Sequence, residues 1–172
     1  MWDNNEKYGL ISRLLHWGMA LLIVWQLLSA ASHNFFEDTA IEAFFWPSHK
    51  PLGVLLLALM VLRVLWALIN VSRRPSSISL FSKLGHVTLY LVLIAVPVLG
   101  LLRQYGSGRT FEVFGIQLFA GFEGDKIKWM MDAGSDFHGE LGWALLLLIV
   151  GHVAMAIKHR KTEQNVLPRM WQ

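Results

Sequence analysis

Two histidines in the C-terminal half of the chain have a spacing that suits redox chemistry. His138 and His152 stand fourteen residues apart, in or next to an apolar stretch of helical character. Fourteen helical steps of ~100° return to nearly the same face, and at ~1.5 Å per residue the two imidazoles lie ~21 Å apart. Imidazoles at two depths of a membrane are what two stacked haems would require. Electron transfer across a membrane is therefore the first hypothesis.

The elements that must position these histidines are predicted from hydropathy. The chain has 172 residues, of which 55% are hydrophobic and only 16% are charged. Such a composition is unusual for a soluble domain and typical of a membrane protein. Four apolar runs approach the ~20 residues that a bilayer demands, and their backbone polar groups can be satisfied only in helices. We predict an all-α integral membrane four-helix bundle, one domain over 1–172, with helices at approximately 13–32, 48–71, 82–103 and 137–159.

The distribution of Lys and Arg predicts the orientation of the bundle. The side with both termini and the second loop carries nine basic and three acidic residues, whereas the other side carries five basic and nine acidic residues. The positive-inside rule then places both termini in the cytoplasm. The basic pI near 9.4 follows from this topology and requires no nucleic-acid partner. A cleaved signal peptide is the alternative for the first helix, because Lys7 and Arg13 precede its apolar run; an even number of spans fits the basic C-terminus better.

Four histidines fall at two matching depths in this arrangement. His49 and His138, at the starts of helices that run inward, share the outer level. His16, at the start of the first helix, and His152, near the end of the fourth, share the inner level. The sequence therefore predicts two bis-histidine pairs as ligands of two b-type haems per chain. Glycines close to these histidines (Gly18, Gly53, Gly85, Gly142 and Gly151) would either admit a flat macrocycle or serve close helix packing.

The remaining histidines and one buried cation each have more than one predicted role. His86 and His159 also lie at the inner level, where either could replace an assigned ligand, line a quinone or proton site, or be an ordinary interfacial residue. His33 is expected to point elsewhere. Arg63 stands fourteen residues after His49, well inside the second helix, with no acidic residue at its depth. A lone buried arginine is costly, so we expect a haem propionate, a quinone oxygen or a lipid phosphate as its partner.

Several chemistries are excluded or disfavoured by what the chain contains. It has no cysteine, which excludes thioether-attached haem, iron–sulfur clusters and disulfides. A transporter with membrane histidines would need carboxylates within its helices and broken helices around a midplane site, and neither is evident. The Gly-rich, aromatic third loop, about Arg103 to Phe137, predicts an interfacial aromatic belt or an amphipathic cap on the outer surface.

Several segments of the chain resemble the bacterial cytochrome b561 family. They are Ser12-Arg13-Leu14-Leu15-His16-Trp17, Met60-Val61-Leu62-Arg63, Gly85-His86-Val87-Thr88-Leu89-Tyr90, Pro97-Val98-Leu99-Gly100 and Gly151-His152. The resemblance covers nearly the whole chain and implies a multi-pass, di-haem b quinone oxidoreductase of the bacterial inner membrane. It implies the same ligand pairs, His16 with His152 and His49 with His138, and ubiquinone as acceptor.

The family resemblance also raises the question of the electron donor. One relative in the family oxidises superoxide at the outer side and reduces ubiquinone. Superoxide is an anion, and the acidic outer loops would suit a cationic donor better, such as a basic periplasmic redox protein. Lys50, Lys126 and Lys128 could still form a local positive patch. The alternative functions are a haem-binding anchor and an electron-transfer subunit of a larger dehydrogenase or hydrogenase.

Overall fold

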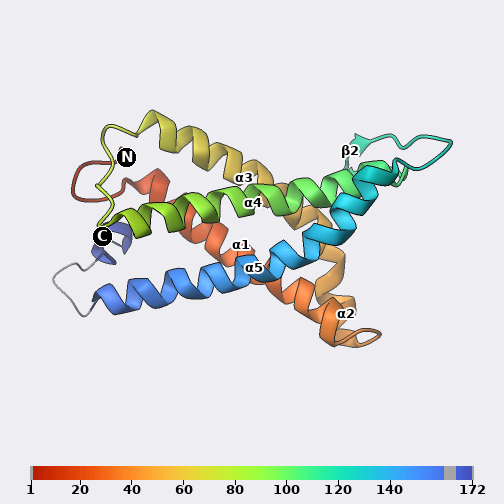
Figure 1. Cartoon of the computed structure of the whole chain (residues 1–172), viewed down its shortest axis with the longest axis horizontal. Helices are drawn as coiled ribbons and strands as arrows, with labels where there is room; N and C mark the ends of the chain where they lie inside the picture. Colours follow the sequence, from red (N-terminus) through yellow and green to blue (C-terminus); the bar gives the residue numbers. More distant parts are fainter. Residues whose placement is uncertain (1, 161–165, 172) are drawn as a thin grey trace.

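Four long helices dominate the computed structural model, which describes residues 2–160 and 166–171. They are α1 (Leu10–Phe35), α3 (His49–Ile69), α4 (Leu80–Gly106) and α5 (Lys128–Arg160), joined by shorter elements (Figure 1). In the described part of the chain, these four are the helices long and apolar enough to cross a membrane. The second of these spans also includes the short helix α2 (Ala40–Phe45), which precedes α3. The predicted four-helix membrane bundle is therefore confirmed. The last helix begins at Lys128 rather than near 137.

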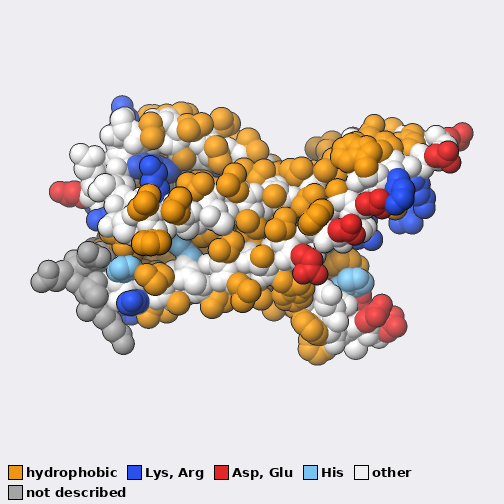
Figure 2. Space-filling model, viewed as in Figure 1, with side chains coloured by type: hydrophobic (Ala, Val, Ile, Leu, Met, Phe, Trp, Pro, Cys, Tyr) orange, Lys and Arg blue, Asp and Glu red, His pale blue; other side chains and the backbone are white. Residues whose placement is uncertain are grey.

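The surface of the bundle is apolar along most of its length. Side chains such as Leu21 and Leu147 are each 73% exposed, and hydrophobic atoms cover the middle of the molecule while charged groups gather towards its ends (Figure 2). A soluble monomer rarely exposes so much contiguous apolar surface. Lipid is the solvent that this surface fits.

The helices pack as two neighbouring pairs. α4 lies along α5, α1 packs on α3, and α3 joins the pairs through α4. Gly106 and Gly134 bring α4 and α5 together, because a Cβ at Gly134 would overlap Arg103 and the Leu99 carbonyl oxygen. Within the described residues, α5 has few or no close backbone contacts with α1 or α3. The helix α5 therefore packs chiefly on α4.

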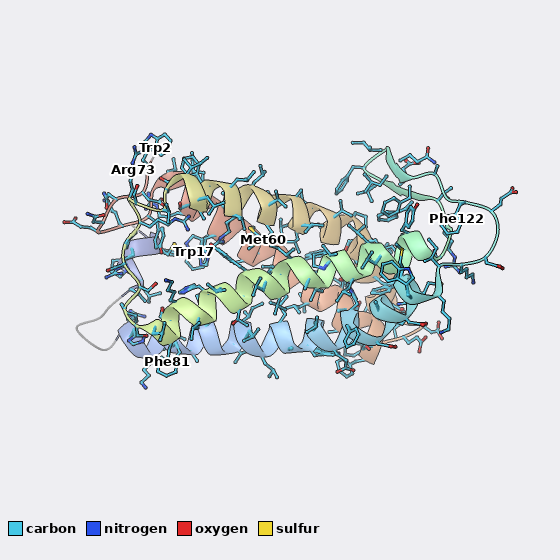
Figure 3. All side chains as sticks on the ribbon, turned by 45° about the horizontal axis from the view of Figure 1, so that its top comes forward. Trp2, Trp17, Met60, Arg73, Phe81 and Phe122 are labelled. Carbon is cyan, nitrogen blue, oxygen red and sulfur yellow. The ribbon has the colours of Figure 1, made fainter. Side chains whose placement is uncertain are left out.

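Both termini lie at one end of the bundle (Figure 1), which we call the inner end after the predicted orientation. Here the N-terminal segment is fixed by Asp3, whose carboxylate accepts hydrogen bonds from Gly9 N and Ser12 Oγ and pairs with Arg74 Nε at 3.0 Å. Trp2 and Arg73 lie beside one another at this end, with the guanidinium 4.9 Å from the ring centroid (Figure 3). The short helix α6 (Pro168–Trp171) returns to α1, where Trp17 Nε1 donates to the Met170 carbonyl.

The opposite, outer end contains two features that interrupt the helices. The chain turns from α2 through a 3₁₀ turn, η1 (Trp46–Ser48), into α3, with Pro47 inside the turn. The third loop forms an antiparallel hairpin of β1 (Phe111–Val113) and β2 (Ile116–Phe119). Phe114 and Gly115 both have positive φ, of 53° and 77°, as a two-residue hairpin turn of the primed type requires. This hairpin is absent from the sequence-based prediction, which expected a belt or a cap.

Candidate functional site

The predicted histidine pairs face one another across the bundle at two levels. At the outer level the ring centroids of His49 (α3) and His138 (α5) are 6.0 Å apart, and their planes cross at 74°. At the inner level those of His16 (α1) and His152 (α5) are 6.3 Å apart, at 69°. His138 and His152 belong to one unbroken helix. Both levels are thus built between α5 and the helices that do not pack closely on it.

The separation of the rings can be compared with what a shared metal would need. An imidazole nitrogen binds a transition metal at about 2 Å and lies about 1.1 Å from its ring centroid, so two imidazoles on opposite sides of one metal have centroids ~6 Å apart. The separations of 6.0 and 6.3 Å have this value. The distance between the two rings at each level therefore fits a group whose metal the two imidazoles would share.

The outer pair is also held in the protonation state that a ligand needs. Ser29 Oγ donates its only hydrogen to the Gln26 carbonyl at 2.7 Å, so it accepts from His49 Nδ1 at 2.8 Å. His138 Nδ1 lies 2.8 Å from the Val96 carbonyl, which can only accept. Both rings therefore carry a proton on Nδ1 and leave Nε2 free to bind a metal.

Gly100 on α4 allows His138 to reach that carbonyl. A Cβ at position 100 would lie 3.0 Å from His138 Cε1 and 3.1 Å from Nδ1. Any larger residue would push the imidazole away from α4. The sequence offered a partial signal, since Gly100 belongs to the Pro97–Gly100 segment that resembles the family; Ser29, twenty positions before its histidine, offered none.

The inner pair has a third histidine beside it. His86 on α4 has its ring centroid 5.3 Å from that of His152, closer than the 6.3 Å between His16 and His152. Its Nδ1 lies 2.7 Å from the Ser82 carbonyl, so this nitrogen donates, and within the described residues no hydrogen bond to Nε2 is found. Of the two separations, that of His16 and His152 is the better match for ligands on opposite sides of one metal.

Arg63 reaches the same level from α3. Its Nε donates to the Tyr90 hydroxyl at 3.2 Å, and its Nη2 lies 3.1 Å from His16 Nδ1. In the part of the chain that the structure describes, Arg63 has no ion pair with a carboxylate. The sequence predicted that Arg63 has no acidic partner at its depth, but it did not indicate Tyr90 or His16 as its hydrogen-bond partners.

The glycines beside the histidines are not used for tight helix packing. A Cβ at Gly18, Gly85, Gly142 or Gly151 would meet nothing within 4 Å, and one at Gly53 would meet only Gln26 Nε2 at 3.5 Å. This open space agrees with the first of the two predicted roles, which is to admit a flat macrocycle beside the histidines. The close-packing role belongs to Gly106 and Gly134 instead.

Two further histidines lie away from the facing pairs. His159 is in the last turn of α5, seven positions beyond His152. His33, in the last turn of α1, points elsewhere than His16, as expected: its Nδ1 lies 2.6 Å from Glu42 Oε1, and its ring stacks on Trp46 at the outer end.

Comparison with known proteins identifies the family. Residues 7–172 match the family model described as prokaryotic cytochrome b561. The chain belongs to this family. It is 32% identical to "Cytochrome b561 homolog 2" of Escherichia coli (strain K12), over 98% of this chain and 93% of the relative. It is 26% identical to "Probable superoxide oxidase CybB" of Yersinia pestis, over 65% of this chain and 66% of that relative.

Membership of the cytochrome b561 family gives the coarse function. The chain is a multi-pass membrane cytochrome of the bacterial inner membrane that binds b-type haem and transfers electrons. The resemblance noted from the sequence is confirmed.

Proposed function

We propose that the chain carries electrons from a donor at the outer side to the membrane quinone pool through two b-type haems. The observation that carries this proposal is the presence of two facing histidine pairs, His49–His138 and His16–His152, at two levels of one continuous helix. A haem at each level would accept and release one electron at a time, with no open coordination position. Fourteen residues of helix separate the levels by ~21 Å, most of the ~30 Å hydrocarbon thickness.

The role of Arg63 in this proposal follows from proton placement. A guanidinium can only donate, so the contact with His16 Nδ1 requires that nitrogen to lack a proton. A neutral histidine that binds metal through Nε2 needs the proton on Nδ1. Arg63 is therefore expected to leave His16 for an anionic group, such as a haem propionate, when the inner level is loaded. Its positive charge favours the reduced state there, and so electron flow inward.

The inner end is the proposed side of quinone reduction. Quinone reduction consumes two protons for two electrons, and the ring of His86 lies 5.3 Å from that of His152, centroid to centroid. His86 is exposed and His159 lies in the basic last turn of α5, so both are placed to deliver protons from the inner side. Ubiquinone is the acceptor that we propose.

The ligand assignment is tested by counting haems. In the purified protein we expect two haems per chain by absorbance of the extracted cofactor, and one in each of the His49→Ala and His152→Ala variants. His33→Ala, which removes a histidine outside both pairs, should keep two and serves as the control. If either ligand variant retains both haems, the pairs are wrongly assigned.

The electron donor has two candidates, which are superoxide and a basic redox protein. The relative from Yersinia pestis is named a probable superoxide oxidase, but the outer end of this chain is acidic. Lys128 is engaged by Asp132 at 2.7 Å and Lys50 donates to Gln104, which weakens the proposed positive patch. We favour a cationic donor.

Salt dependence separates the two donors. Reduction by a small basic cytochrome should be fast and should slow as ionic strength rises, because screening removes the attraction. Rapid reduction by superoxide, with a basic cytochrome inactive at any salt concentration, would contradict this choice.

Turnover of quinone by the purified chain alone would argue against a role only as the anchor or subunit of a larger dehydrogenase or hydrogenase.

A further inference from the structure

Three aromatic rings form a continuous stack from the outer surface to His49. The ring of His33 lies parallel to that of Trp46, with centroids 3.9 Å apart and planes at 9°. The centroid of Trp46 is in turn 4.8 Å from that of His49, at 33°. The side chain of His33 is 41% exposed. The stack therefore begins in solvent and ends on a proposed haem ligand.

The local fold holds each ring in place. The 3₁₀ turn between α2 and α3 sets Trp46 three residues before His49, one turn away on the same side. Glu42 Oε1 lies 2.6 Å from His33 Nδ1, and Glu42 Oε2 accepts from the Asp38 backbone N–H at 2.7 Å. The orientation of His33 is thus fixed by a carboxylate that is itself fixed by the backbone.

We propose that the His33–Trp46 stack is the electron-input route of the protein. One electron leaves a donor at the surface, passes by tunnelling through the two rings, and reduces the group held by His49; no bond forms or breaks and no proton moves. Tunnelling weakens steeply with the gap between donor and acceptor, and rings in van der Waals contact keep that gap short. This inference rests on the proposed function, because it requires a haem on His49.

The surroundings of the stack indicate the charge of the donor. A hollow of about 410 Å³ next to α2 is lined by Trp46 together with Glu42, Asp38 and Thr39, which lets a small group reach the indole. Acidic side chains gather at this end of the molecule (Figure 2). A negative corner attracts a cation and repels superoxide. The route therefore fits a positively charged one-electron donor.

A light-activated label tests the route within one molecule. The chain has no cysteine, so Glu37→Cys places a single ruthenium polypyridine label beside the stack, and a flash then injects one electron. We expect Trp46→Leu to slow the appearance of reduced outer haem roughly tenfold, and Trp46→Phe, which keeps a ring, to slow it much less. Trp129→Leu, which removes a tryptophan that is 61% exposed at the start of α5, should leave the rate unchanged.

A second label position distinguishes loss of the electron route through Trp46 from a disturbance of the outer haem site by the substitution. With the label at Glu140→Cys on α5, near His138, the route avoids Trp46, and Trp46→Leu should not change the rate. The absorbance spectrum, haem content and midpoint potential of the outer haem should also be unchanged. If Trp46→Leu slows transfer from both labels or shifts that potential, Trp46 positions His49 and the proposal is wrong.

If Trp46→Leu loses haem, a second variant still tests the route. His33→Leu then replaces Trp46→Leu, because His33 contacts Trp46 and Glu42 rather than a ligand, and it should slow transfer from the Glu37 label alone. Unchanged transfer in a variant that keeps both haems overturns the route but leaves the proposed function intact. A wild-type protein without two haems would instead overturn the proposed function.

Discussion

At the scale of single residues, the position of one proton distinguishes the two histidine pairs. His49 and His138 each donate from Nδ1 to an oxygen, so both are prepared to bind metal through Nε2. His16 instead faces a guanidinium that can only donate. The outer level is therefore preorganised by the protein alone. In the proposed function, the inner level would be completed when an anionic group takes the place of His16 as the partner of Arg63.

Ser29 provides the test of this preorganisation. If His49 binds haem iron as proposed, a hydrogen bond from its Nδ1 to Ser29 Oγ would make the imidazole a stronger electron donor and favour oxidised iron. We expect Ser29→Ala to raise the midpoint potential of the outer haem by about 40 mV, which corresponds to about 1 kcal/mol for one hydrogen bond. A redox titration followed by absorbance measures the shift, and the potential of the inner haem should not move.

Ser32→Ala is the matched control for that change. Ser32 is 2% exposed and donates to the Ser29 carbonyl, just as Ser29 donates to that of Gln26. It makes the same bond within the helix, one turn further along α1. An equal shift in both variants would mean that the effect comes from α1 as a whole, and not from the bond to His49.

At the scale of elements, the contact between α4 and α5 near Gly134 positions His138. Gly134 lies against Arg103 and the Leu99 carbonyl, whereas a Cβ at Gly139 on the same helix would meet nothing within 4 Å. The close approach near Gly134 brings His138 to the Val96 carbonyl one turn later. Small residues at one crossing thus determine the geometry of the outer level.

Substitution of these two glycines should have opposite consequences. Gly134→Ala forces a Cβ into the backbone of α4 and should lower stability by about 1–3 kcal/mol, a loss of ~2–4 °C in midpoint temperature per kcal/mol. Gly139→Ala should be neutral or gain up to about 1 kcal/mol from helix propensity. Thermal unfolding in detergent, followed by circular dichroism, measures both. Equal behaviour of the two variants would contradict the assignment of the crossing to Gly134.

At the scale of the whole molecule, the two ends differ in both composition and structure. Both termini and the connection from α3 to α4 lie at one end (Figure 1), where Asp3 is 3% exposed and paired with Arg74. The hairpin lies at the other end, together with the acidic side chains near α2, such as Asp38 and Glu42. Of the residues counted for the positive-inside bias, Lys161 and Glu163 lie outside the described residues.

The orientation in the membrane stays a prediction and can be measured with reporters. A fluorescent protein that folds only in the cytoplasm should be active when fused after Gln172. It should be inactive when inserted at Gly124, in the loop after the hairpin. Alkaline phosphatase, which folds only in the periplasm, should give the reverse pattern. Phosphatase activity at the C-terminus would reverse the proposed direction of electron flow.

Much of the fold and of the proposed site could be predicted from the sequence. Hydropathy predicted the four helices because a bilayer imposes length and apolarity on every span. Helical periodicity paired His138 with His152 because both stand on one rigid element. Alternating helix direction then predicted that His16 and His49 face them, and the rings do lie together at two levels.

Only the tertiary structure decided which side chains surround those rings. Ser29, Gly100 and Tyr90 approach their partners from other helices, and the rotation of one helix against another leaves little trace in a single sequence. The Trp46 stack likewise depends on the turn between α2 and α3 and on the end of α1, which meet only in the folded chain. The sequence determined the depth of each histidine, because depth follows from position along one helix. The fold determined the neighbours and hydrogen-bond partners of the histidines, because these depend on how separate helices pack.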